Sequence, residues 1–90
     1  MATYCVHGYV SGHVQGVSFR YFTAQQATDN RVTGWAKNLP DGRVEFLLCG
    51  TQSAVNAVVT ALHTGPPLAR VTGVDVTPTN RQVVYGFTIS

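Results

Sequence analysis

The sequence predicts an α+β sandwich, a fold in which two helices cover one face of an antiparallel sheet. Three observations point to this class. The chain has 90 residues, which suits one domain with a two-layer core. Apolar residues alternate in some segments and recur at helical spacing in others. These segments follow one another as strand, helix, strand, strand, helix and strand, so we expect residues 1–90 to form a single domain built from two split βαβ units.

The first strand and the first helix are expected near the N-terminus. Side chains alternate between two faces over residues 3–11, which is the period of a strand. Ser18 is a suitable N-cap for a helix that continues to about Asn30. The buried side of this helix would consist of Phe19, Phe22 and Ala27.

A hairpin is expected next. Two strand-like segments, residues 31–38 and 43–49, flank the sequence LPDG, which is typical of a turn. Their alternating side chains and short connection predict two antiparallel neighbours in the sheet.

The second helix has the clearest helical pattern. Ser53 is expected to cap it, and the sequence GPP at residues 65–67 to end it. Positions i, i+3, i+4 and i+7 carry the apolar residues Val55, Val58, Val59 and Leu62. Residues 71–77 and 84–89 are strand-like again, with a polar loop between them.

The composition is typical of a compact globular protein. Apolar residues make up 44% of the chain and charged residues 11%, and no apolar run approaches the roughly 20 residues of a membrane helix. The first ten residues, MATYCVHGYV, lack a basic segment followed by an apolar one, so we expect a cytoplasmic protein. Basic residues are scattered, which argues against a large nucleic-acid footprint. The cysteines and histidines lack the spacing of a zinc site, so no metal is expected.

The segment SGHVQGVSFR, residues 11–20, has the features of an anion site. Glycines allow it to curve, backbone N–H groups that precede a helix are free donors, and Arg20 adds a charge suited to phosphoryl oxygens. The alternative is an ordinary strand-to-helix turn with a solvent-exposed arginine. In the expected topology the first and second strands end at the same edge of the sheet, so Asn38 should lie near this segment.

The phosphate chemistry open to such a site is limited. The segment has neither the GK[ST] of a P-loop nor a cysteine six residues before Arg20, and the four carboxylates are isolated. His13 could relay a proton, although tuning of local charge is the better interpretation. A carboxylate leaving group needs no proton, and Asn38 could orient a water for attack without repelling phosphate. The alternative for Asn38 is a turn residue that ends a strand.

Two blocks of the sequence carry a family resemblance. VSGHVQGVSFR, residues 10–20, and GWAKNLPDGRVE, residues 34–45, closely resemble the two signature segments of the acylphosphatases at their usual separation, and the resemblance extends over essentially the whole chain. It implies a ferredoxin-like βαββαβ fold and a small hydrolase, free of metal and cofactor, that cleaves acyl phosphates into a carboxylate and inorganic phosphate. By this match Arg20 binds the phosphoryl oxygens and Asn38 orients the nucleophilic water.

The resemblance also implies a phosphate-binding loop that acts mainly through backbone N–H groups. Its residues would be Val14, Gln15, Gly16, Val17, Ser18 and Phe19, followed by Arg20. His13 stands where the family commonly has arginine, so the affinity for dianionic substrates and its pH dependence stay open. We expect a monomer whose partners are the acyl phosphate and inorganic phosphate, without nucleic acid or membrane.

Two further features have alternative interpretations. Cys5 and Cys49 would lie on neighbouring strands, where the geometry permits a disulfide, but a cytoplasmic location favours two separate thiols. Tyr9 and Trp35 could stack nucleic-acid bases in a noncatalytic module, but the RNA-recognition signature is missing and we expect no basic residues around them. A phosphate-binding domain without turnover is the other rival, and a turnover assay separates it from an enzyme.

Overall fold

The computed structural model of this protein describes residues 3–90. Met1 and Ala2, which belong to the expected domain of residues 1–90 and to the N-terminal segment used to predict location, lie outside the described residues. Seven elements follow in the order β1 (Tyr4–His13), α1 (Phe19–Asp29), β2 (Thr33–Asn38), β3 (Val44–Gly50), α2 (Gln52–Thr64), β4 (Arg70–Pro78) and β5 (Phe87–Ile89). Each predicted element is present, although most boundaries differ by a few residues.

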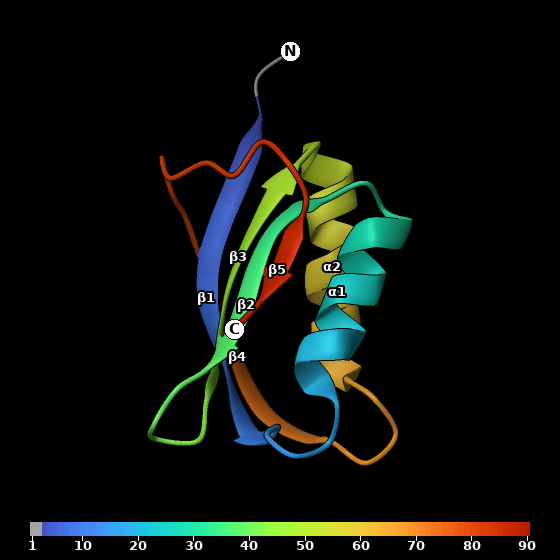
Figure 1. The fold of residues 1–90 in the computed structure, drawn as a ribbon, viewed down its shortest axis with the longest axis vertical. Helices are drawn as coiled ribbons and strands as arrows, with labels where there is room; N and C mark the ends of the chain where they lie inside the picture. The colour runs from blue at the N-terminus through green and yellow to red at the C-terminus, as the bar shows by residue number, and fades with distance from the viewer. Residues whose placement is uncertain (1–2) are drawn as a thin grey trace.

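The five strands form one sheet in the order β4-β1-β3-β2-β5. The pairs β1–β4, β1–β3 and β3–β2 are antiparallel, whereas β5 runs parallel to β2. Both helices lie on one face of this sheet (Figure 1). The α+β sandwich with a ferredoxin-like arrangement is therefore confirmed, and the short parallel strand β5 makes the sheet mixed rather than wholly antiparallel.

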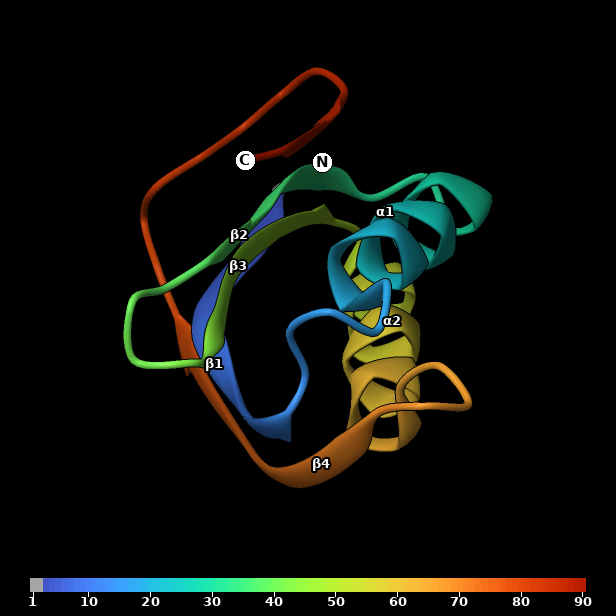
Figure 2. The ribbon, with the colours of Figure 1, turned by 60° about the horizontal axis from the view of Figure 1, so that its bottom comes forward.

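The direction of β5 follows from the path of the chain before it. Residues 79–86, which we call the crossover segment, pass over the face of the sheet opposite the helices (Figure 2). The Thr79 N–H donates to the Cys5 carbonyl, and the Gly34 N–H donates to the Gly86 carbonyl, both at 3.0 Å. The chain thus crosses the sheet at the end where β1 and β2 both begin. From that end β5 enters the far edge of the sheet in the same direction as β2.

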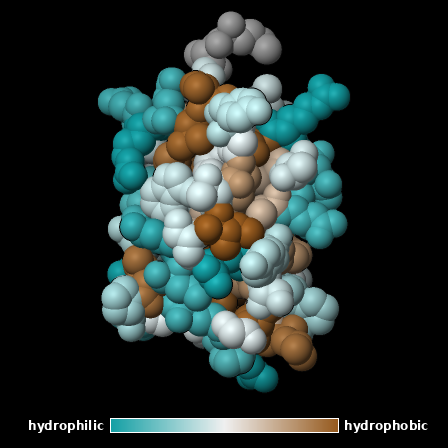
Figure 3. All heavy atoms as spheres, in the orientation of Figure 1, coloured by the Kyte–Doolittle hydropathy of each residue, from teal (hydrophilic) through white to brown (hydrophobic). Residues whose placement is uncertain are grey.

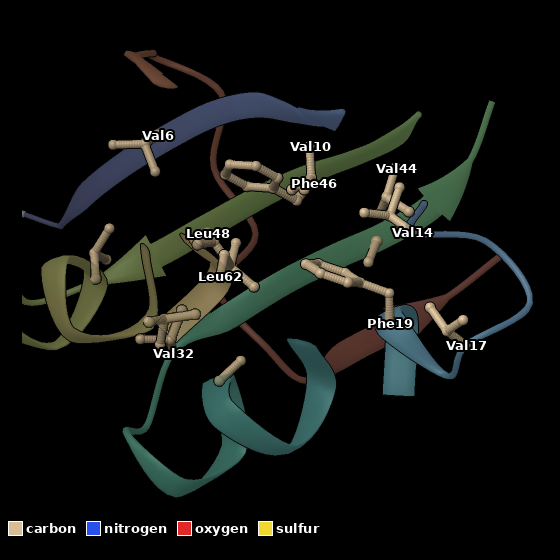
Figure 4. Close-up of a cluster of buried hydrophobic side chains, with 14 residues drawn as sticks. Val6, Val10, Val14, Val17, Phe19, Val32, Val44, Phe46, Leu48 and Leu62 are labelled. Atoms are coloured by element: carbon tan, nitrogen blue, oxygen red, sulfur yellow. The ribbon is translucent and has the colours of Figure 1, made fainter. Parts of the chain in front are cut away.

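The core lies between the sheet and the helices and also holds the β1–α1 loop. Side chains from strands, helices and this loop meet in one cluster, including Val10, Phe46 and Leu62 (Figure 4). Val14 and Val17 of the loop are buried in the same cluster. Their burial anchors the loop by packing at two points, so its backbone is held rigidly.

Helix α1 has a buried polar residue that the apolar pattern did not indicate. Thr23 is fully buried, and its hydroxyl donates to the Phe19 carbonyl at 2.9 Å, which satisfies it inside the core. Phe19 and Ala27 are buried as predicted, whereas Phe22 is only half-buried.

The helix N-termini differ from each other. Thr51, not Ser53, caps α2, because Thr51 has the extended backbone of an N-cap and its hydroxyl accepts from the Ala54 N–H at 3.2 Å. Ser18 precedes α1 as predicted, but its side chain makes no capping hydrogen bond. The first-turn N–H groups of α1 therefore lack a side-chain cap.

Cys5 and Cys49 form a disulfide. The prediction of two separate thiols is wrong, because the register of β1 and β3 places these residues directly opposite each other with their Cα atoms 4.1 Å apart. The bond lies on the face that the crossover segment covers, in a small cluster with Leu47, Trp35 and Val83.

Reduction of this disulfide is expected to destabilise the fold. The bond joins residues 44 positions apart, and the loss of chain entropy in the unfolded state predicts a contribution of about 2–4 kcal/mol. Denaturant unfolding of the oxidised and reduced protein should show this difference as a lower midpoint after reduction. Equal midpoints would contradict the expected contribution.

Candidate functional site

A pocket of about 200 Å³ lies between the β1–α1 loop, the first turn of α1 and the end of β2. The loop and the β2–β3 turn both lie at the lower end of the molecule in Figure 1. The residues that line the pocket are Val14, Gly16, Ser18, Phe19, Arg20, Tyr21 and Asn38. The structure thus brings most of the predicted site residues together, whereas Gln15 and Val17 do not line the pocket.

The backbone of the loop has a conformation suited to anions. Gly16 and Ser18 both adopt left-handed conformations, with φ of 76° and 64°. Left-handed residues in a turn allow successive backbone N–H groups to converge on one centre, and such nests bind anions. For Ser18 this conformation costs about 1–2 kcal/mol, a strain typical of functional sites. The uncapped N-terminus of α1 adds further donors and the positive end of the helix dipole.

Arg20 provides the positive charge of the pocket. It lies in the first turn of α1, and its guanidinium donates to the main-chain oxygen of Ser90, just after β5. None of the ion pairs formed within residues 3–90 includes Arg20, and none of the pocket-lining residues is acidic. No local pattern in the sequence indicates the Ser90 contact, which depends on the parallel entry of β5 beside β2.

Asn38 lines the pocket from the end of β2, across from the loop and Arg20. It is the last residue of β2, pairs with Val44 in β3 and is exposed. The strand order places β2 two strands away from β1, so the end of β2 and the loop after β1 flank the same pocket. This arrangement is the one that the split βαβ topology predicts.

His13 lies outside the pocket lining. It is exposed and ends β1 opposite Arg70 of β4, after an irregularity between Ser11 and Gly12. The loop therefore begins after His13, at Val14, rather than around it.

The face of the sheet opposite the helices has basic residues around its aromatic side chains, so the expectation that they are absent there is wrong. The Arg43 guanidinium lies 4.3 Å from the centre of the Tyr9 ring, and Lys37 and Arg81 lie 5.4 and 5.5 Å from that of Trp35. Strand register could not reveal the Arg81 contact, because Arg81 belongs to the crossover segment, whereas Lys37 follows Trp35 by two residues in β2 and therefore shares its face. Carboxylates also surround these cations: Glu45 pairs with Lys37 at 3.4 Å and Asp41 pairs with Arg43 at 2.8 Å. The face is thus mixed in charge rather than strongly basic.

Glu45 is a half-buried carboxylate on this face, and its pKa is lowered. Burial acts to raise its pKa, but hydrogen bonds from His7 and Lys37 outweigh burial and hold the pKa below its usual value. A carboxylate with a lowered pKa stabilises the fold above the pKa of the unfolded chain, and this contribution is lost as the pH falls through the folded-state pKa.

The variant Glu45→Gln tests this pH dependence. We expect it to lower the free energy of unfolding by about 1 kcal/mol near neutral pH, and the difference from wild type to shrink as the pH falls through the lowered folded-state pKa. Denaturant unfolding at several pH values measures both. A difference that is independent of pH would contradict the role of the ionised carboxylate.

Residues 3–90 contain neither a helix that could span a membrane nor a cluster of metal ligands. Neither helix in the described part of the chain is long and apolar enough to cross a membrane. Over residues 3–90 no three His, Cys, Asp or Glu side chains are grouped as ligands for a metal ion. On the face seen in Figure 3, apolar side chains are dispersed among polar ones.

Comparisons with known proteins agree with one another. The family model for Acylphosphatase matches residues 6–89. An acylphosphatase of Pseudomonas paraeruginosa is 45% identical over 99% of this chain and 98% of its own, and one of Chromohalobacter salexigens is 58% identical over 79% of each. The crystal structure of acylphosphatase from Bacillus subtilis has a TM-score of 0.92 and 38% identity, covering 97% of this chain and 98% of its own. An acylphosphatase structure from Coxiella burnetii has a TM-score of 0.93 and 35% identity, covering 98% and 93%.

Proposed function

We propose that this chain, which belongs to the acylphosphatase family, hydrolyses the carboxyl-phosphate bond of acyl phosphates by direct attack of a water that Asn38 orients. Membership of this family shows that the chain is an enzyme that acts on acyl phosphates. What we propose is the role of each residue in that reaction. The observation that carries them is the shared pocket of the loop, Arg20 and Asn38. That the protein is a cytoplasmic monomer without nucleic-acid or membrane partners stays a prediction.

Phosphate binding is assigned to the loop and Arg20. Backbone N–H groups of residues 14–19 and the first turn of α1 would donate to the phosphoryl oxygens, and the Arg20 guanidinium would add charged donors. Because Val14 and Val17 are buried, these donors are held in place before substrate arrives. Preorganised donors stabilise the charge that develops in the transition state without further rearrangement.

The hydrolytic step is assigned to a water held by Asn38. The amide oxygen of Asn38 would accept a hydrogen bond from this water, and its NH₂ group would donate to a phosphoryl oxygen. The water oxygen bonds to phosphorus as the bond from phosphorus to the acyl oxygen breaks, and the carboxylate leaves with the electron pair. The carboxylate has a conjugate-acid pKa of about 4 and so needs no proton. Because no carboxylate or imidazole lines the pocket, we assign the proton of the attacking water to a phosphoryl oxygen of the substrate.

Hydrolysis of benzoyl phosphate in the presence of a metal chelator tests this function. We expect rapid release of inorganic phosphate that the chelator does not slow, and competitive inhibition by inorganic phosphate. Activity restored only by a divalent cation would contradict a metal-free reaction. Binding of inorganic phosphate without any turnover by the folded protein would instead support the noncatalytic alternative.

A further inference from the structure

The side chain of Gln15 points away from the pocket, although its backbone belongs to the loop. Its amide nitrogen donates two hydrogen bonds, to the Leu39 carbonyl at 2.8 Å and to the Arg43 carbonyl at 2.9 Å. Both acceptors belong to the β2–β3 turn, which begins directly after Asn38. Gln15 therefore connects the loop to the turn that carries Asn38.

The two carbonyls are also the ones that close this turn. The Leu39 N–H donates to the Arg43 carbonyl at 2.8 Å, and the Gly42 N–H donates to the Leu39 carbonyl at 3.1 Å. Each carbonyl thus accepts one main-chain hydrogen bond and one from Gln15. The side chain of Gln15 consequently holds both ends of the turn at once, and the position of the turn is coupled to that of the loop.

Asn38 needs such support because packing does not hold it. The Asn38 side chain is exposed, whereas Val14 and Val17 of the loop that contains Gln15 are buried. A displacement of about 1 Å of a positioning group can cost roughly 10²-fold in rate. Pairing with Val44 holds the backbone of Asn38 in the sheet, and the Gln15 side chain connects the turn after Asn38 directly to the loop.

We infer that Gln15 is a positioning residue, which holds Asn38 at the correct distance from a phosphoryl group bound in the loop. The inference rests on the proposed function, since it acts through the water that Asn38 orients. Loss of the Gln15 hydrogen bonds should lower turnover while the phosphate donors, which are Arg20 and the loop N–H groups, stay in place.

The variant Gln15→Met tests this inference, because methionine has a similar length but no donor. We expect kcat for benzoyl phosphate to fall about 10-fold or more, and the inhibition constant for inorganic phosphate to change less than about 3-fold. The matched control is Gln25→Met on the exposed side of α1, which should behave as wild type. An unchanged kcat in folded Gln15→Met, or an equal loss of phosphate affinity, would overturn the inference. Gln15→Asn, which is too short to reach both carbonyls, provides the same test if the methionine variant does not fold.

A double variant tests whether Gln15 acts through Asn38. In the Asn38→Ala background the change Gln15→Met should lower the residual rate by less than about 2-fold, because the group it positions is gone. The same fold-loss in both backgrounds would overturn the coupling. If wild type does not hydrolyse benzoyl phosphate, the proposed function fails and this inference fails with it. If wild type is active and Gln15→Met equals it, this inference alone fails.

Discussion

Replacing Arg20 by alanine is expected to lower kcat/KM for benzoyl phosphate by about 10³-fold or more. Arg20 is the charged side chain of the pocket, and no acidic residue lines the pocket to offset it. Its loss removes attraction for the bound phosphoryl group and stabilisation of the charge that develops during transfer. Both the rate and the affinity for inorganic phosphate should therefore fall.

Steady-state kinetics with inorganic phosphate as inhibitor measure both effects. Arg31→Ala removes an exposed arginine beyond the other end of α1 and serves as the control for net charge, with kinetics expected to equal those of wild type. Arg20→Lys keeps the charge without the planar fork of donors, so an intermediate loss is expected. Equal phosphate inhibition of wild type and Arg20→Ala would rule out the binding role of Arg20.

Replacing Asn38 by alanine is expected to lower kcat by about 10²- to 10³-fold with little change in phosphate affinity. The side chain is exposed at the end of β2, so its removal leaves the core intact and the thermal midpoint should stay close to that of wild type. The loop N–H groups and Arg20 lie on the other side of the pocket and keep their hydrogen bonds to phosphate, so the variant loses only the one donor of the Asn38 NH₂ group. A selective loss of turnover separates the orientation of water from the binding of phosphate.

Two further variants make this result specific. Asn56→Ala, on the exposed side of α2, is the control and should keep wild-type kinetics. Asn38→Asp places a negative charge beside the phosphoryl group, so it should weaken phosphate inhibition as well as turnover. If Asn38→Ala stays fully active, the nucleophilic water is positioned by another group and the proposed role of Asn38 is wrong.

The fold class was predictable because its signals are local. The alternation of residues 3–11, the helical spacing of α2 and the turn sequence LPDG each depend on neighbours in the chain. The topology then limits which strand ends can meet, so the proximity of Asn38 to the loop followed from the order of the elements. Cap residues were less predictable: Thr51 and Ser53 are both good N-caps, and backbone conformation decides between them.

The candidate site was predictable only as far as its backbone donors, its arginine and its asparagine. The side-chain connections that position them join residues far apart in sequence, such as Gln15 with Arg43 and Arg20 with Ser90. Such contacts leave no periodic pattern, because each depends on the direction of one side chain in the packed structure. The disulfide belongs to the same class, since the exact register of β1 and β3 decides whether Cys5 and Cys49 meet.

The order of the elements, the apolar core and the loop that suits an anion can be read from the amino-acid sequence, because propensity and hydrophobic period act between nearby residues. Three features follow only from the packed molecule: the parallel pairing of β5, the closure of the disulfide and the connection from Gln15 to the turn after Asn38. Each of these brings together groups whose separation along the chain is large, and only the packed sheet and helices set the distance between such groups.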